Sequence, residues 1–200
     1  MDRPPHVIDL GDLILRRFAR DADLPELWRV IEESSEHLRP WMAWVAGHDR
    51  AATARFLDRR HEAWEEGRDF TYAIVREGAV VGACQLFRRD GCRGEGLEAG
   101  YWLHPRATGR GLATRAVRAL VEEAFRLPGV EHVDIVHDLA NRASGAVPER
   151  LGFSRHRRRP AERTAPAESG EEQVWRLTLR QAGFKQPSIP GTAQGCAQYG

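Results

Sequence analysis

Residues 106–113 combine glycine and arginine in a pattern suited to binding phosphate. The segment reads Arg106-Ala-Thr-Gly-Arg-Gly-Leu-Ala113 and joins an apolar stretch to an amphipathic one. The first backbone N–H groups of a helix lack intrahelical partners and carry the positive end of the helix dipole, so an anion binds there readily. Gly109 and Gly111 let the main chain approach a pyrophosphate, while Arg106 and Arg110 can add charge-assisted hydrogen bonds. The segment therefore predicts a site for a phosphorylated cofactor.

Three other interpretations of this segment have to be weighed. A Gly-x-Gly pair also occurs in structural surface turns. The run from Gly109 to Thr114 nearly matches a dinucleotide-binding fingerprint and is followed by Asp134 and Asp138, but its third glycine is missing and the turn that starts at His104 is too long. A nucleoside-triphosphate loop would need Gly-Lys-Ser/Thr, which does not follow. The turn alone leaves more than one kind of site open.

The segments around this turn are predicted to form a strand, helix, strand unit. Apolar residues that follow the turn recur on one helical face, as expected of a helix packed on a sheet: Ala113, Val117, Leu120, Val121 and Ala124. Pro128-Gly129 ends the helix, and Val133–Val136 reads as a short buried strand. Parallel pairing of the two strands would place a ligand at their C-terminal ends.

The rest of the chain predicts a mixed sheet with two further helices. The first helix starts at residues 21–23, and the second starts at Asp49 or Thr53 and ends at Gly67. Strands are predicted at residues 13–18, 70–75, 79–87, 97–103, 154–159 and 173–179, with residues 76–78 as a hairpin turn. We expect one α/β domain over residues 1–182 and a flexible tail over residues 183–200, which are rich in Gly, Pro, Gln and Ser.

Composition excludes several classes of function. A formal net charge of +1 gives no global drive toward nucleic acid or membranes, and no apolar run could span a bilayer. The N-terminus lacks the apolar core of a signal peptide, so we expect a cytoplasmic protein. Neither the three cysteines nor the eight histidines have metal-ligand spacing, and Cys84 is expected in the core. Arg155–Arg159 is either a ribosome-facing basic patch or a solvated edge strand, and its lack of interleaved aromatics favours the latter.

Four segments, in the right order, resemble the GNAT acetyltransferases, and in particular their RimJ/RimL-like branch. Residues 106–113 are similar to the family's acyl-CoA signature, Arg/Gln-x-x-Gly-x-Gly/Ala, and residues 141–153 to its Asn-x-x-Ser…Leu-Gly-Phe segment. Residues 98–103 resemble its central strand, and residues 36–44 its acceptor-side segment. The resemblance implies an α/β fold with a mixed, centrally splayed sheet of six or seven strands and about four helices. It also implies acetyl-CoA as acyl donor, while the spacing of cysteine and histidine predicts no metal.

The resemblance implies direct attack of a primary amine on the thioester in a ternary complex. A base has to remove a proton from the amine, and Glu98 on the central strand matches the family's acidic residue, with Glu95 in reserve. Glu98 could instead pair with an arginine or face solvent. Backbone N–H groups near Leu103 would hold the developing oxyanion. The implied cofactor-binding residues are Leu103, Arg106, Thr108, Gly109, Arg110, Gly111, Leu112, Ala113, Asn141 and Ser144.

The leaving thiolate needs a hydrogen-bond donor, and here the chain departs from the family. Many members carry a tyrosine in the helix before Leu-Gly-Phe, where this chain has Pro148. Ser144 therefore becomes the candidate donor, and Asn141 would bind the pantetheine arm, although both residues could simply cap a helix. Because Pro148 has no N–H to offer the carbonyl of Ser144, we expect a kinked or very short helix.

The acceptor is less constrained by the sequence. Trp41 and Trp44 could wall a substrate cleft, with Glu36 and Arg39 as polar contacts, although either tryptophan could be core. The RimJ/RimL-like resemblance implies the α-amine of a protein N-terminus, such as that of a ribosomal protein. Two rivals stay open: acetylation of a small amine (aminoglycoside, polyamine or amino acid), and a non-catalytic acyl-CoA sensor. The chain is expected to be a monomer or a homodimer.

Overall fold

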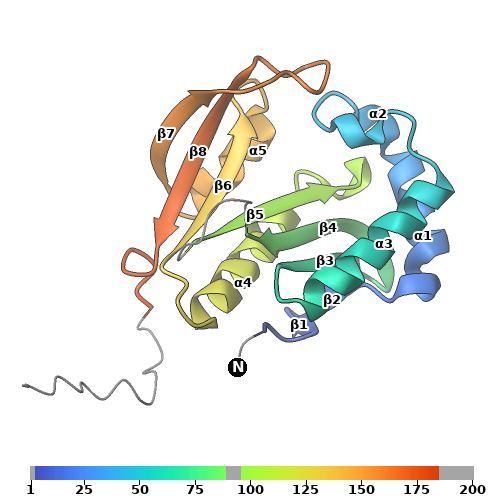
Figure 1. Ribbon diagram of the computed structural model, residues 1–200, viewed down its shortest axis with the longest axis horizontal. Helices are drawn as coiled ribbons and strands as arrows, with labels where there is room; N and C mark the ends of the chain where they lie inside the picture. The colour runs from blue at the N-terminus through green and yellow to red at the C-terminus, as the bar shows by residue number, and fades with distance from the viewer. Residues whose placement is uncertain (1–2, 89–95, 185–200) are drawn as a thin grey trace, which may run out of the picture.

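One mixed β-sheet organises the molecule. A computed structural model describes residues 3–88 and 96–184. Eight strands form the sheet in the order β1-β2-β3-β4-β5-β6-β8-β7 (Figure 1). The strands are β1 (Val7–Asp9), β2 (Ile14–Arg17), β3 (Asp69–Arg76), β4 (Ala79–Phe87), β5 (Gly96–Leu103), β6 (His132–Asp138), β7 (Ser154–Pro160) and β8 (Glu171–Thr178).

Helices cover both faces of this sheet. They are α1 (Arg20–Glu33), α2 (Ser35–Leu38), α3 (Arg50–Glu65), α4 (Leu112–Arg126) and α5 (Arg142–Arg150), with short 3₁₀ turns at Ala43–Val45 and Pro105–Ala107. Alternate residues of β3 belong to different cores, because successive side chains of a strand point to opposite faces. Tyr72 and Ile74 pack in the core that includes α4, whereas Ala73 and Val75 pack with α1 and α3.

The sheet opens between β5 and β6. These two strands are parallel and pair only over Gly96–Glu98 and His132–Asp134. Beyond this point β5 follows β4 and β6 follows β8, so the strands diverge toward their C-terminal ends (Figure 1). The opening exposes a strand edge inside the molecule, which is where a ligand can add its own hydrogen bonds.

The fold class predicted from the sequence is confirmed, including the parallel β5–α4–β6 unit. The described residues hold two elements that the sequence did not signal: the three-residue strand β1 and the four-residue helix α2. Most of the expected tail lies outside the described residues, and so do the other two cysteines, Cys92 and Cys196. Phe184, near the end of the described chain, still packs against Phe125, with ring centroids 5.6 Å apart.

Candidate active site

The turn before α4 has the features of an anion cradle. Gly109 and Gly111 have φ values of +72° and +74°, a left-handed conformation that favours glycine. A Cβ added at either position would meet no protein atom within 4 Å, so backbone conformation rather than crowding requires these glycines. Gly111 is the N-cap of α4 and no side chain caps the helix, so the cradle fits a phosphate group.

Side chains of the turn divide into structural and available groups. The Thr108 hydroxyl donates to the carbonyl of Pro105 at 2.8 Å and so shapes the turn itself. Leu112 is buried under the helix start. Arg106 and Arg110 are exposed, and within the described chain neither guanidinium is engaged in an ion pair. Both line a hollow of about 450 Å³ beside the turn, where they can reach a bound anion.

The open edge of β5 offers backbone donors. The His104 N–H donates to Val81 of β4 at 2.8 Å. Because strand N–H groups alternate between the two edges, those of Tyr101 and Leu103 point to the opposite edge, toward the opening. This supports the expectation that backbone groups near Leu103 hold an oxyanion.

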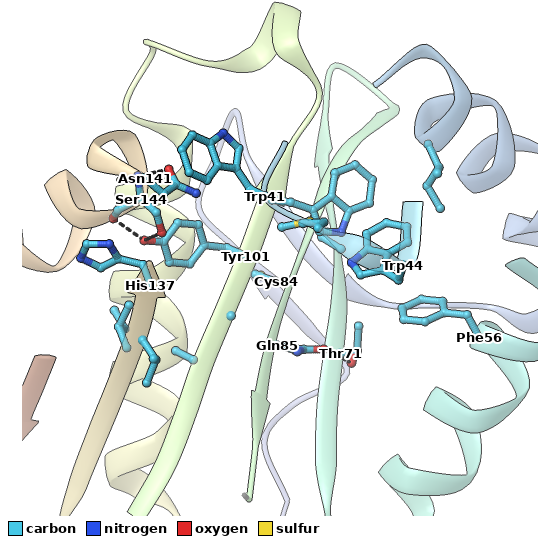
Figure 2. Close-up of a pocket in the computed structure, with 18 of the residues that line it drawn as sticks. Trp41, Trp44, Phe56, Thr71, Cys84, Gln85, Tyr101, His137, Asn141 and Ser144 are labelled. Carbon is cyan, nitrogen blue, oxygen red and sulfur yellow. Dashed lines mark hydrogen bonds between the residues drawn. The ribbon is translucent and has the colours of Figure 1, made fainter. Parts of the chain in front are cut away.

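A cavity of about 560 Å³ fills the opening between β5 and β6 and continues toward α1 and α3. Figure 2 shows Ser144, Tyr101, Asn141 and His137 on one side of it and Trp44 with Phe56 on the other. The cavity thus connects the β5–β6 opening to the face of the sheet covered by the N-terminal helices. Cys84 also lines it and is buried, as expected of a core cysteine.

Tyr101 and Ser144 are joined at the start of α5. The Tyr101 hydroxyl donates to the Ser144 carbonyl at 2.8 Å and lies 3.3 Å from Ser144 Oγ. That carbonyl would accept the N–H of residue 148 in a regular helix, but Pro148 has none. The phenol therefore occupies the acceptor that the proline leaves unpaired. Burial raises the pKa of Tyr101 to about 12, so its hydroxyl stays protonated at neutral pH.

Asn141 caps α5, which is the alternative role that the sequence left open for it. Its Oδ1 accepts the backbone N–H of Ser144 at 3.1 Å. Asn141 also lines the cavity, so its amide NH₂ is placed near the opening. Helix α5 has nine residues and continues for two residues past Pro148, so it is not as short as expected from the sequence.

His137 lines the same side of the cavity but is held as a neutral ring. Its Nε2 lies 2.9 Å from the indole N–H of Trp175, which can only donate, so Nε2 accepts. Its Nδ1 lies 2.7 Å from the backbone carbonyl of Asp138, which can only accept, so Nδ1 carries the proton. Both ring nitrogens are engaged, and His137 is therefore a wall of the cavity rather than a base.

Two of the four acceptor-side residues predicted from the sequence line the cavity. Trp41 and Trp44 do, and Trp44 is 45 % exposed. Glu36 and Arg39 lie on the exposed surface of α2 and just after it, outside the cavity lining. Trp102 of β5 joins the wall, with its ring centroid 6.3 Å from that of Trp44.

The candidate base lies outside the cavity lining. Glu98 is half-buried at the last β5 position that still pairs with β6, opposite Asp134. It is engaged in an interaction within the protein. The next residue on the same face of the strand, Gly100, does line the cavity. Glu95 falls outside the described residues.

His48 is a titratable cavity residue that the sequence did not signal. Its Nε2 lies 2.8 Å from the Thr53 hydroxyl, and its ring packs edge-on against Trp44. Burial lowers the pKa of His48, so the ring is neutral at pH 7. Tyr101, His137 and Trp102 were also missed. Only Tyr101 had a sequence signal, because Pro148 requires some other donor for the Ser144 carbonyl.

The described residues hold no group of three or more His, Cys, Asp or Glu side chains that could bind a metal ion. Nor does the described chain have a helix that is both long and apolar enough to cross a bilayer.

The sequence is similar to those of known acetyltransferases. A family model described as "Acetyltransferase (GNAT) domain" matches residues 12–154. The chain is 26% identical over 146 residues to YdaF, a proposed ribosomal N-acetyltransferase of Bacillus subtilis (strain 168), a match that covers 72% of this chain and 79% of YdaF.

Solved structures share the fold. RimL, a ribosomal L7/L12 α-N-protein acetyltransferase in complex with coenzyme A, superposes with a TM-score of 0.80 at 17% identity and covers 88% of this chain and 99% of its own. The microcin C7 self-immunity acetyltransferase MccE, bound to acetyl-CoA and AMP, has a TM-score of 0.79 and a sequence identity of 19%, and the match covers 88% of this chain and 98% of MccE. RimJ of Mycobacterium smegmatis, in complex with a CoA disulfide, has a TM-score of 0.76 and a sequence identity of 20%, and the match covers 90% of this chain and 86% of RimJ.

Proposed function

Because this chain belongs to the GNAT acetyltransferase family and is an acetyl-CoA-dependent acyltransferase, we propose that its acceptor is the α-amine at the N-terminus of a protein or peptide. The observation that carries the proposal is the cavity, which runs from Ser144 and Tyr101 at the strand opening to the exposed Trp44 on the acceptor side. Such a cavity admits the end of a polypeptide while leaving the rest outside. The similarity to YdaF and the shared fold with RimL support the same acceptor class.

Acetyl-CoA, when bound, supplies an activated thioester. The N-terminus of α4 and its two left-handed glycines fit the pyrophosphate, and Arg106 and Arg110 add positive charge. The open edge of β5 would hold the pantetheine arm, together with Asn141. In this proposal the Leu103 N–H donates to the thioester carbonyl oxygen as negative charge develops on it.

Protonation of the leaving sulfur falls to the pair at the start of α5. The Tyr101 hydroxyl already donates its proton to the Ser144 carbonyl, so the Ser144 hydroxyl is the group left to donate to a thiolate. In this arrangement Tyr101 positions α5, and Ser144 carries out the proton donation.

For proton removal from the amine we propose Glu98, acting through water because its side chain does not line the cavity. Gly100, which has no side chain, separates Glu98 from the cavity along that face of β5. His48, neutral and inside the cavity, is the competing base. In this proposal the enzyme works in the cytoplasm, as a monomer or a homodimer.

The test is thiol release from acetyl-CoA with a panel of N-terminal peptides, polyamines, aminoglycosides and amino acids. We expect turnover on peptides, and a fall of about 100-fold in kcat for Glu98→Gln with little change in acetyl-CoA affinity. Glu32→Gln, an exposed change on α1 outside the cavity lining, is the matched control.

Other outcomes identify the rival functions. Turnover restricted to small amines would replace the acceptor class. Tight acetyl-CoA binding with no thiol release on any amine would favour the sensor. A fall in kcat for His48→Gln but not for Glu98→Gln would transfer the role of base to His48.

A further inference from the structure

Helix α3 turns one face toward the acceptor side of the cavity. Ala52, Phe56, Arg59 and Arg60 line it, and their spacing of four, three and one residues places them on one side of a helix. This face therefore brings two positive charges to the part of the cavity walled by aromatic side chains.

The two arginines differ in what they already bind. Arg60 is paired with the buried carboxylate of Asp69 and stacks over the Phe56 ring, with Cζ 5.1 Å from the centroid. Arg59 is exposed, and its side chain is engaged by no ion pair or hydrogen bond within residues 3–88 and 96–184. Arg59 is thus a cation at the cavity with its charge available to a ligand.

The acidic side chains that line the cavity are all committed to the protein. Asp138 accepts hydrogen bonds from the backbone N–H groups of residues 140, 169 and 170. Glu168 accepts two backbone N–H groups of its own loop, at 2.6 and 2.8 Å. Glu172 is paired with Arg159 at 2.7 Å. Among the described cavity residues, negative charge is neutralised or hydrogen-bonded, whereas the positive charge of Arg59 is not.

The acceptor side also presents an unusually exposed aromatic ring. Trp44 and Val7 are the large hydrophobic side chains left exposed in the described chain, and Trp44 lines the cavity near Phe56 (Figure 2). An exposed aromatic side chain and an available guanidinium that line one cavity suit a ligand with an apolar part and an anionic group.

We propose that the acceptor subsite selects amines that carry a carboxylate a few bonds from the reacting nitrogen, with Arg59 as the specificity-determining residue. In a polypeptide, this means an N-terminus followed closely by aspartate or glutamate. The inference rests on the proposed function in taking the amine as the acceptor, and it adds a charge preference. It disfavours polycationic acceptors, because no uncommitted carboxylate of the described lining receives a second ammonium group.

The same charge aids the chemistry. A nearby cation disfavours the protonated form of an amine, and so does desolvation in an aromatic cavity. Arg59 therefore holds the acceptor through its carboxylate and offsets the tendency of that carboxylate to keep the neighbouring amine protonated.

The test compares three peptides that differ only at residues 2–4, which are Asp, Asn or Lys, with wild type, Arg59→Gln and Arg59→Glu. For wild type we expect kcat/KM in the order Asp, Asn, Lys, with about a fivefold to tenfold advantage of Asp over Asn. Arg59→Gln should remove the advantage and Arg59→Glu should reverse the order, mainly through KM. Arg55→Glu makes the same charge change on α3 outside the cavity lining and should keep the wild-type order.

Equal kcat/KM on the three peptides, or an acidic preference that survives Arg59→Glu, would overturn the proposal. If no peptide is acetylated, the peptide acceptor is wrong, and binding decides the charge preference separately. In that case N-acetylated Asp, Asn and Lys peptides are titrated into the CoA complex by calorimetry. Tighter binding of the Asp peptide that is lost in Arg59→Glu would support the subsite, whereas equal or absent binding of the three peptides would refute it. Turnover on spermidine, a polycationic acceptor, would also refute it.

Discussion

The bond between Tyr101 and the Ser144 carbonyl gives a quantitative test of how a proline shapes the active site. If the phenol replaces the N–H that Pro148 lacks, Tyr101→Phe leaves a carbonyl without its donor. Leaving such a group unpaired costs about 1–3 kcal/mol. In a Pro148→Ala background residue 148 has an N–H that can bond the same carbonyl, so we expect Tyr101→Phe to cost about 1 kcal/mol less there.

Urea unfolding of the four variants of this double-mutant cycle, followed by tryptophan fluorescence and far-UV circular dichroism, measures the coupling. Tyr72→Phe is the matched control, since the Tyr72 hydroxyl donates to a different carbonyl, that of Pro5, at 2.7 Å. Its cost should be the same in both backgrounds. An equal cost of Tyr101→Phe with and without Pro148 would refute the reasoning, because the phenol would then have no role that depends on the proline.

Three further predictions follow from the described geometry. Gly111→Ala strains a left-handed residue by about 1–2 kcal/mol, and we expect CoA affinity measured by calorimetry to fall about tenfold. Gly47→Ala, which makes the same change at a left-handed glycine outside the turn before α4, should leave CoA affinity unchanged. Burial raises the pKa of Asp138, but hydrogen bonds from Ser169, Ala140 and Gly170 outweigh it and hold the pKa below its ordinary value. Its contribution to stability is therefore present above about pH 4 and lost as pH falls through the lowered pKa, and Asp138→Asn should flatten the pH dependence of unfolding between about pH 2 and 5. Gly145→Ala would place a Cβ 2.7 Å from the ring of His137, which both of its hydrogen bonds hold in place, so we expect the free energy of unfolding to fall by about 1–3 kcal/mol. An unchanged midpoint of urea unfolding would show that the ring moves aside.

Local sequence was sufficient for most of the fold. The Arg76–Gly78 hairpin, the Asp49 cap of α3 and the turn before α4 were predicted because each depends on neighbouring residues. The strand β1 escaped because its three residues carry too little pattern, and it is held by pairing with β2.

In the candidate site too, features that depend on neighbouring residues could be predicted, whereas those that depend on packing could not. The left-handed glycines of the turn before α4 could be predicted from the sequence, because their conformation depends on neighbouring residues alone. The acceptor side could not, because Trp44, Arg59 and Trp102 come from three separate elements that only packing brings together. Glu36 and Arg39, predicted as polar contacts of the acceptor, lie outside the cavity lining although they are close to Trp41 in sequence.

The sequence by itself determined the glycine-containing turn before α4, most of the strands and helices, and the carbonyl that Pro148 leaves unpaired, because these follow from backbone chemistry over a few residues. Tertiary structure decided that Tyr101 supplies the missing donor and that His137 is neutral. It also decided that the acidic side chains of the cavity are paired or hydrogen-bonded, whereas Arg59 has no such partner in the described chain. The physical reason is that hydrogen bonding and charge pairing depend on which side chains meet, and distant segments meet only when the sheet and its helices pack.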